Sequence, residues 1–144
     1  MVLILALMFA SATCSKKDKI MLREQLLDPV FPGCPIRNVL SRIGDKWTLL
    51  VLLTLEGKAT PLRFKELQRS IPDVSEKMLT ATLRNLEADG LVLRQAYAEV
   101  PPRVEYSLTT RSASLMPLLN NLVNWSLDHF DAIISDRQRF AEKK

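Results

Sequence analysis

The chain has 144 residues, which is long enough for one domain with a modest hydrophobic core and terminal extensions. Its formal net charge of +4 suits a polyanionic partner, and one histidine with two cysteines cannot form a histidine–cysteine zinc cluster. No glycine-rich phosphate loop occurs, and the 6% aromatic residues are not interleaved with basic ones as they are where single-stranded nucleic acid stacks. We expect no cofactor and no enzymatic activity, because nothing in the sequence places the base that a thiol enzyme would need.

The first twenty residues contain an apolar run, residues 2–10, followed by a segment that loosely resembles a lipoprotein cleavage site and ends at Cys14. No Lys or Arg precedes the run, and it is shorter than the roughly 20 residues that cross a bilayer, so we expect no membrane partner. We expect residues 1–20 to reflect a start site placed upstream of the biological one, with the domain in residues 21–144. An amphipathic addition to a dimer interface and export are the alternatives.

Cys34 is followed by Pro35, which suits the first position of a short helix predicted over residues 35–41. Helix-end amides and the nearby Arg37 would lower the pKa of a thiol at that N-cap. Two interpretations stay open: a small residue packed at a helix start, or a reactive thiol.

A buried helix is predicted over residues 46–55, with Asp45 as its N-cap and its end near Gly57. Trp47 is expected to anchor the core rather than to bind a ligand, because a large aromatic side chain among leucines usually packs against them.

Two short amphipathic helices joined by a tight break follow. The first is predicted over residues 62–71, with Thr60 as N-cap and Pro61 as first helical residue. Apolar residues on one side of it face basic residues on the other: Phe64, Leu67 and Ile71 against Arg63, Lys65 and Arg69. The run Pro72-Asp73-Val74 ends this helix, and the pair is typical of a helix-turn-helix.

The second helix, residues 75–89, begins at Ser75 as N-cap and ends at Gly90. Its leucines form one apolar stripe, and small and cationic residues form the opposite face: Leu79, Leu83 and Leu86 against Lys77, Ala81, Arg84 and Ala88. Such a face suits a DNA major groove, because small residues permit close approach while Lys and Arg reach guanines and phosphates. Taken alone, it also fits an ordinary amphipathic helix with a solvated face.

A β-hairpin is predicted over residues 91–109, with its turn around Pro101 and Pro102, which cannot donate ladder hydrogen bonds. In its second strand Val104, Tyr106 and Leu108 alternate with polar residues, as in a half-buried strand. Helix, break, helix and hairpin in this order predict a winged helix-turn-helix, a mainly α fold with a small β-hairpin wing.

A long helix is predicted over residues 111–140, with Pro117 in or near its first turns and a bend if the proline lies deeper. Its apolar face is wider than a small winged domain can cover, so we expect a homodimer that uses this helix together with the N-terminal segment. The expected interface residues are Leu26, Leu27, Leu119, Leu122, Trp125 and Phe130.

Several segments together resemble the HxlR-type family of bacterial transcriptional regulators. They are Cys34-Pro35, Ile43-Gly44-Asp45-Lys46-Trp47-Thr48-Leu49-Leu50, Arg63-Phe64-Lys65-Glu66-Leu67, Ser75-Glu76-Lys77-Met78-Leu79 and Val100-Pro101-Pro102-Arg103-Val104-Glu105-Tyr106-Ser107-Leu108-Thr109, and the match runs from about Cys34 to Asp131. The resemblance implies a dimeric, cytoplasmic winged-helix protein that binds operator DNA, and some members sense oxidants or electrophiles through a cysteine at the position of Cys34. One departure is Ser112, where the family usually carries a glycine.

We therefore expect a sequence-specific transcriptional regulator that binds double-stranded operator DNA through residues 75–89 and the wing. Lys77 and Arg84 are the first candidates for contacts, and the others are Ser75, Thr80, Asn85, Arg63, Lys65, Arg94 and Arg103. Arg103 could instead pair with Glu99 or Glu105 across the hairpin. The alternative function is a winged-helix protein–protein interaction module without DNA binding.

Overall fold

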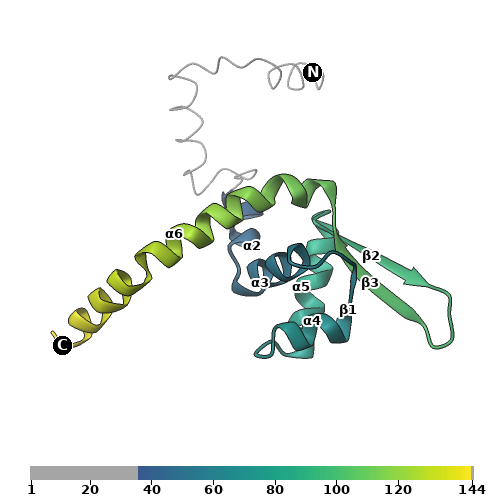
Figure 1. The fold of residues 1–144 in the computed structure, drawn as a ribbon, viewed down its shortest axis with the longest axis horizontal. Helices are drawn as coiled ribbons and strands as arrows, with labels where there is room; N and C mark the ends of the chain where they lie inside the picture. Colours follow the sequence, from purple (N-terminus) through teal and green to yellow (C-terminus); the bar gives the residue numbers. More distant parts are fainter. Residues whose placement is uncertain (1–35, 144) are drawn as a thin grey trace, which may run out of the picture. The chain divides into compact units, whose positions relative to one another are not determined.

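The computed structural model describes residues 36–143 (Figure 1). They fall into two units, divided between Gly44 and Asp45. The described part of the first unit is one helical segment, a π-helix η2 (Ile36–Leu40) continued by α2 (Ser41–Ile43). It ends where the Gly44 N–H donates to the carbonyl of Leu40 at 2.8 Å. A short helix was predicted here, whereas Cys34, Leu26 and Leu27 lie outside the described residues.

The second unit begins with α3 (Lys46–Glu56), whose bounds agree with the prediction. The Asp45 carboxylate accepts hydrogen bonds from the N–H groups of the first turn, at 3.1 and 3.2 Å, and Gly57 ends the helix. The prediction for Trp47 is wrong in part: its ring is only partly buried and carries the Lys46 ammonium 4.1 Å from its centroid. The core side of α3 consists of Thr48, Val51, Leu52 and Leu55.

The helix-turn-helix consists of α4 (Phe64–Ser70) and α5 (Glu76–Ala88), separated by the predicted break. The predicted start of the first helix is wrong, because Thr60 and Pro61 precede a short strand, β1 (Leu62–Arg63). The backbone of β1 pairs with a later strand, and the Glu66 carboxylate accepts a hydrogen bond from the Arg63 N–H at 2.7 Å. The helix therefore begins only after Arg63.

The hairpin consists of β2 (Val92–Tyr97) and β3 (Arg103–Leu108), paired antiparallel from Val92–Leu108 to Tyr97–Arg103. Its strands and its turn agree with the prediction. With β1 they form a three-stranded sheet in the order β1-β3-β2, so β3 is the central strand (Figure 1). The predicted alternation of buried and exposed residues along β3 is wrong: all six residues are half-buried, since both neighbours and the ion pairs of Arg103 cover them.

A tight corner joins α5, the hairpin and the last helix. Gly90 ends α5 with a φ of +68°, a conformation that favours glycine, and the Thr109 hydroxyl donates to its carbonyl at 2.7 Å. Thr109 also caps α6 (Thr110–Ala141) by accepting from the Ser112 N–H at 3.3 Å. Ser112 is fully buried in the first turn of α6, and its hydroxyl donates to the Leu91 carbonyl. No left-handed backbone is needed there, so serine fits where the family usually has glycine.

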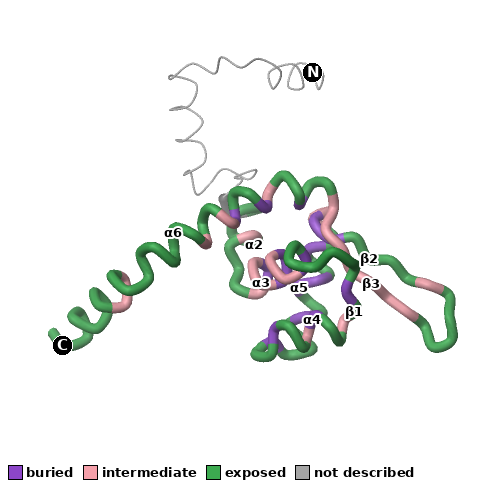
Figure 2. The backbone as a smooth tube through the Cα atoms, viewed as in Figure 1, coloured by how far each residue is buried: buried purple, intermediate pink, exposed green. Residues whose placement is uncertain are grey.

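The core lies between α3, α4, α5, the sheet and the first three turns of α6, which supply Met116 and Leu119 (Figure 2). Pro117 lies inside α6, in its third turn, and the helix curves along its length (Figure 1). Beyond Leu119 the helix is mostly exposed (Figure 2). Within residues 36–143 no helix combines the length and the apolar character that a membrane span requires. The fold is the predicted winged helix-turn-helix.

Candidate nucleic-acid interface

The outward face of α5 presents small and cationic side chains together. Leu79, Leu83 and Leu86 are at most 2% exposed and pack inward, whereas Lys77, Thr80, Ala81 and Arg84 are exposed on the other side. The Ser75 hydroxyl accepts a hydrogen bond from the Met78 N–H at 3.2 Å, so this residue starts the helix at the edge of the same face. Asn85 is also exposed on α5. The amphipathic pattern of α5 is therefore as predicted.

Two adjoining hollows connect this face to α4 and to the sheet. One is lined by Phe64, Glu76, Lys77, Thr80, Ala81 and Arg84. The other is lined by Phe64, Thr80, Leu83, Arg84, Glu87, Arg94 and Tyr106. Because Phe64, Thr80 and Arg84 border both, the hollows form one shallow surface across α5. The structure thus brings together Lys77, Thr80, Arg84 and Arg94, four of the residues predicted to contact DNA.

The basic residues of α4 lie beside the wing. Arg63, Lys65 and Arg69 line a third hollow together with Pro102, Arg103 and Val104. The Lys65 ammonium donates to the Glu76 carboxylate at 2.8 Å, and this contact lowers the pKa of Glu76 below its ordinary value. Lys65 therefore links α4 to the first turn of α5 while remaining 68% exposed.

Arg103 forms the contacts that were considered as the alternative to DNA binding. Its Nη1 donates to Glu105 and its Nη2 to Glu99, both at 2.8 Å, and its guanidinium lies 4.0 Å from the centroid of Tyr97. The hydrogen bond to Glu99 contributes most to raising the pKa of Arg103 above its ordinary value, and Glu105 also raises this pKa. The side chain is 27% exposed, and both of its terminal guanidinium nitrogens already donate to carboxylates of the hairpin. Arg94, exposed on β2, is the better placed wing cation.

A second ion pair of the helix-turn-helix could not be predicted from local spacing. Lys46, at the start of α3, donates to Asp73 in the break between α4 and α5 at 3.1 Å, and this lowers the pKa of Asp73. The two residues are 27 positions apart, so no helical or strand period relates them. The break is thus tied to α3 as well as to the two helices it joins.

The exposed part of α6 carries a row of large apolar side chains. Leu118, Leu122, Trp125 and Phe130 are 51 to 64% exposed, and the Trp125 ring stacks on His129 with centroids 4.6 Å apart. The prediction that Leu119 faces a partner is wrong: it is 5% exposed and belongs to the core of this chain, where α6 packs on α3. Among the described residues no cluster of three or more metal ligands occurs.

Comparisons with known proteins agree with this geometry. A family model described as HxlR-like helix-turn-helix matches residues 42–133. An uncharacterized HTH-type transcriptional regulator of Methanothermobacter thermautotrophicus is 50% identical over 93 residues, which cover 64% of this chain and 69% of the relative. YybR of Bacillus subtilis, also named an uncharacterized HTH-type transcriptional regulator, is 42% identical over 106 residues, 73% of this chain and 82% of YybR.

Solved structures with similar folds include two redox or transcriptional regulators. The redox regulator HypR in its reduced form matches with a TM-score of 0.64 and 38% identity, over 70% of this chain and 98% of HypR. The reduced form of the transcriptional regulator YodB from Bacillus subtilis matches with a TM-score of 0.58 and 33% identity, over 67% of this chain and 92% of YodB.

Proposed function

Because this chain belongs to the HxlR-like helix-turn-helix family of DNA-binding transcriptional regulators, we propose that it binds operator DNA as a cytoplasmic homodimer, with α5 in the major groove and the β2–β3 wing beside it. The observation that carries this proposal is the single exposed surface that joins Lys77, Thr80 and Arg84 of α5 to Arg94 of the wing. An ordinary solvated helix face would not need small residues between its cations.

The two cations of α5 have different roles in this proposal. Arg84 reads a base edge, since a guanidinium can donate two parallel hydrogen bonds to guanine. Lys77, in the first turn, meets a phosphate, which positions the protein but carries no sequence information. Lys65, Arg63 and Arg94 add contacts to the phosphate backbone on either side of the groove.

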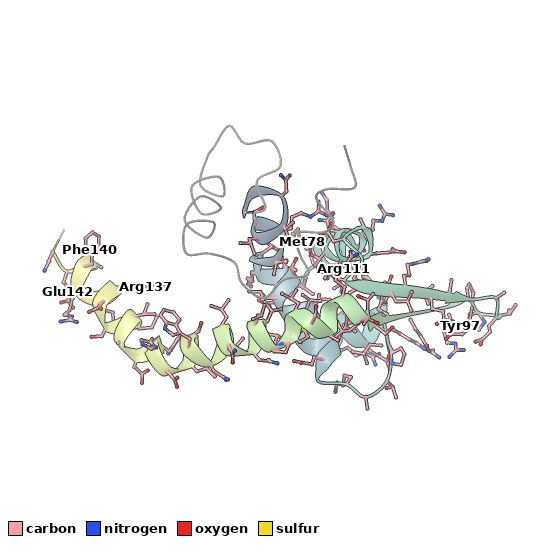
Figure 3. All side chains as sticks on the ribbon, turned by 90° about the horizontal axis from the view of Figure 1, so that it is seen from above. Met78, Tyr97, Arg111, Arg137, Phe140 and Glu142 are labelled. Carbon is pink, nitrogen blue, oxygen red and sulfur yellow. The ribbon has the colours of Figure 1, made fainter. Side chains whose placement is uncertain are left out.

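The test is binding of the full-length chain to duplexes from the DNA upstream of its own gene, measured by fluorescence anisotropy over a range of salt concentrations. Operator affinity should fall steeply with salt. Arg84→Ala should cost specific sites about 1–3 kcal/mol, whereas Lys77→Ala should weaken all duplexes alike. Arg137→Ala is the matched control, because Arg137 lies in the last turns of α6, far from the hairpin residue Tyr97 (Figure 3).

The outcome that contradicts the proposal is weak, salt-insensitive association with every duplex, in the wild-type chain and in both α5 variants. That behaviour belongs to the rival function, a winged-helix module that binds another protein.

Dimerisation through α6 is part of the proposal. A two-fold symmetric operator needs two recognition helices about one DNA turn apart, roughly 34–36 Å. Leu122, Trp125 and Phe130 are exposed apolar side chains beyond the core, which supports α6 as the contact between subunits. Leu26 and Leu27 of the N-terminal segment are proposed to complete this contact.

Cys34 is proposed as a redox-sensitive thiol of the regulator. The proposal rests on its place before Pro35 and near Arg37 in the sequence, and on the 38% identity to a structure named a redox regulator. The thiolate is the reactive form, so the pKa of Cys34 must lie below about 8.5. Alkylation rate measured against pH decides this, and operator binding that ignores both peroxide and Cys34→Ser would leave Cys34 as a packing residue.

A further inference from the structure

The middle of the exposed face of α5 has two small side chains, each with a methyl group. Thr80 and Ala81 are adjacent there, with Lys77 one turn before them and Arg84 one turn after them. Both border a hollow that is also lined by the half-buried Phe64, the first residue of α4, and by Glu76. The methyl groups of Thr80 and Ala81 and the Phe64 ring therefore form a small apolar floor between two cations, with Glu76 at its edge.

An apolar floor needs an apolar partner, and the major groove contains only one. Each base pair presents hydrogen-bond donors and acceptors there, and thymine alone adds a methyl group, at C5. Base-edge donors and acceptors placed on the Phe64 ring or the Ala81 methyl would lose their hydrogen bonds with water and gain none. A methyl group loses nothing by the same contact and removes apolar surface from water.

The spacing of the cations limits where such a thymine can lie. Lys77 and Arg84 are seven positions apart on the helix, a rise of about 10 Å at 1.5 Å per residue. Base pairs are stacked 3.4 Å apart, so the two cations span about three base-pair steps. A methyl group at the level of Thr80 and Ala81 then lies one or two base pairs from the base that Arg84 contacts.

Resting on the proposed function, we propose that each operator half-site contains a thymine whose 5-methyl group packs against Thr80, Ala81 and Phe64, within two base pairs of the guanine that Arg84 reads. This contact makes Thr80 a specificity residue through its methyl group and not through its hydroxyl. The distinction matters because a threonine hydroxyl can hydrogen-bond to several bases and would not select thymine.

The experiment first selects the operator from random duplexes with the full-length chain. Each thymine of the half-site is then replaced by deoxyuridine, which removes the methyl group and preserves base pairing. The duplexes are measured against wild type, Thr80→Ser, which loses the side-chain methyl, and Thr80→Val, which keeps a methyl and loses the hydroxyl. Thr80 is exposed, so neither variant disturbs the core.

One thymine of the half-site should contribute more to the binding affinity through its methyl group than the others. Its replacement by deoxyuridine should weaken wild-type binding about fourfold, the value for burying one methyl group. Thr80→Val should keep this difference between thymine and deoxyuridine, and Thr80→Ser should reduce it to less than twofold. 5-Methylcytosine opposite guanine at the same position should restore part of the lost affinity, because it presents a methyl group at the same place.

Two results overturn the inference while the proposed function stands: operator binding with the expected salt dependence but no thymine near the Arg84 contact, or the same thymine preference in Thr80→Ser as in wild type. The second result would mean that Thr80 and Ala81 are small only to let the helix approach. If wild type instead binds all duplexes alike, the proposed function fails, and the inference fails with it.

Discussion

At the residue scale, Arg103 and Arg94 illustrate two uses of a cation on the wing. Arg103 is held by Glu99, Glu105 and the Tyr97 ring, whereas Arg94 is exposed beside Arg84. We expect Arg94→Ala to lower the slope of log affinity against log salt by about one, as for the loss of one phosphate contact. Arg103→Ala should leave that slope unchanged, and a reduced slope in this variant would show that Arg103 reaches phosphate.

Ser112 closes the corner between the wing and α6 with a buried hydrogen bond to the Leu91 carbonyl. We expect Ser112→Ala to lower the free energy of unfolding by about 0.5–1.5 kcal/mol, because the Thr109 N–H still donates to the same carbonyl at 3.3 Å. Urea denaturation followed by circular dichroism measures this change. Ser114→Ala, on the exposed side of the same turn, is the control and should have a smaller effect.

Single residues were predicted well where the helical period decides their position, and poorly where distant partners decide it. The period of α5 placed Leu79 in the core and Lys77 outside. For Arg103 on the wing, the sequence left two interpretations open, a contact with DNA or a pairing with Glu99 or Glu105. No local period decides between them. Leu119 was misassigned because the apolar side chains of α6 pack in the core in the first turns of the helix and are exposed beyond them.

At the element scale, two ion pairs hold the helix-turn-helix: Lys46 to Asp73 and Lys65 to Glu76. Each lowers the pKa of its carboxyl group below the ordinary value, 3.8 for Asp73 and 4.5 for Glu76. Folding therefore releases protons in this range, and the stabilisation is fully present above the ordinary pKa values and lost as the pH falls through the lowered ones. Both pairs are more than half exposed, so the effect is small and weakens with salt.

We expect the double variant Asp73→Asn, Glu76→Gln to be slightly less stable than wild type at pH 7 and equally stable below pH 3. Urea midpoints measured from pH 2 to pH 7 at low salt give this comparison. Lys46→Met with Lys65→Met should reproduce the loss at pH 7. A constant difference between wild type and the carboxyl variant across the whole range would mean that the ion pairs do not stabilise the fold.

The helices and the hairpin were predictable because caps and breaks are local signals. Asp45, Ser75 and Gly90 each end or begin an element where predicted. The strand β1 was missed because two residues cannot display a period, and its existence depends on pairing with β3, which follows about 40 residues later. The start of α4 was misplaced for the same reason, since the strand includes the residues that follow Pro61.

At the scale of the whole molecule, we expect the exposed apolar side of α6 to form the contact between subunits in the proposed dimer. We expect the wild-type chain to sediment as a dimer at micromolar concentration and Leu122→Asp to sediment as a folded monomer, because the substitution would bury an unpaired charge at a cost of several kcal/mol. Asn124→Asp adds the same charge about 200° around the helix from Leu122 and should remain dimeric. A folded wild-type monomer at that concentration would remove α6 as an interface.

The corner at Thr109 has a consequence for how such regulators diversify. Because Thr109 ends the wing and caps α6 while bonding to the last turn of α5 through Gly90, no linker separates the two parts. In the proposed dimer, the contact that α6 makes with the partner subunit then sets the distance between half-sites, and α5 with Phe64 of α4 sets the base sequence within each half-site. Mutations in α6 can thus change the preferred spacing of the half-sites, and mutations in the helix-turn-helix can change the preferred base sequence, each without affecting the other.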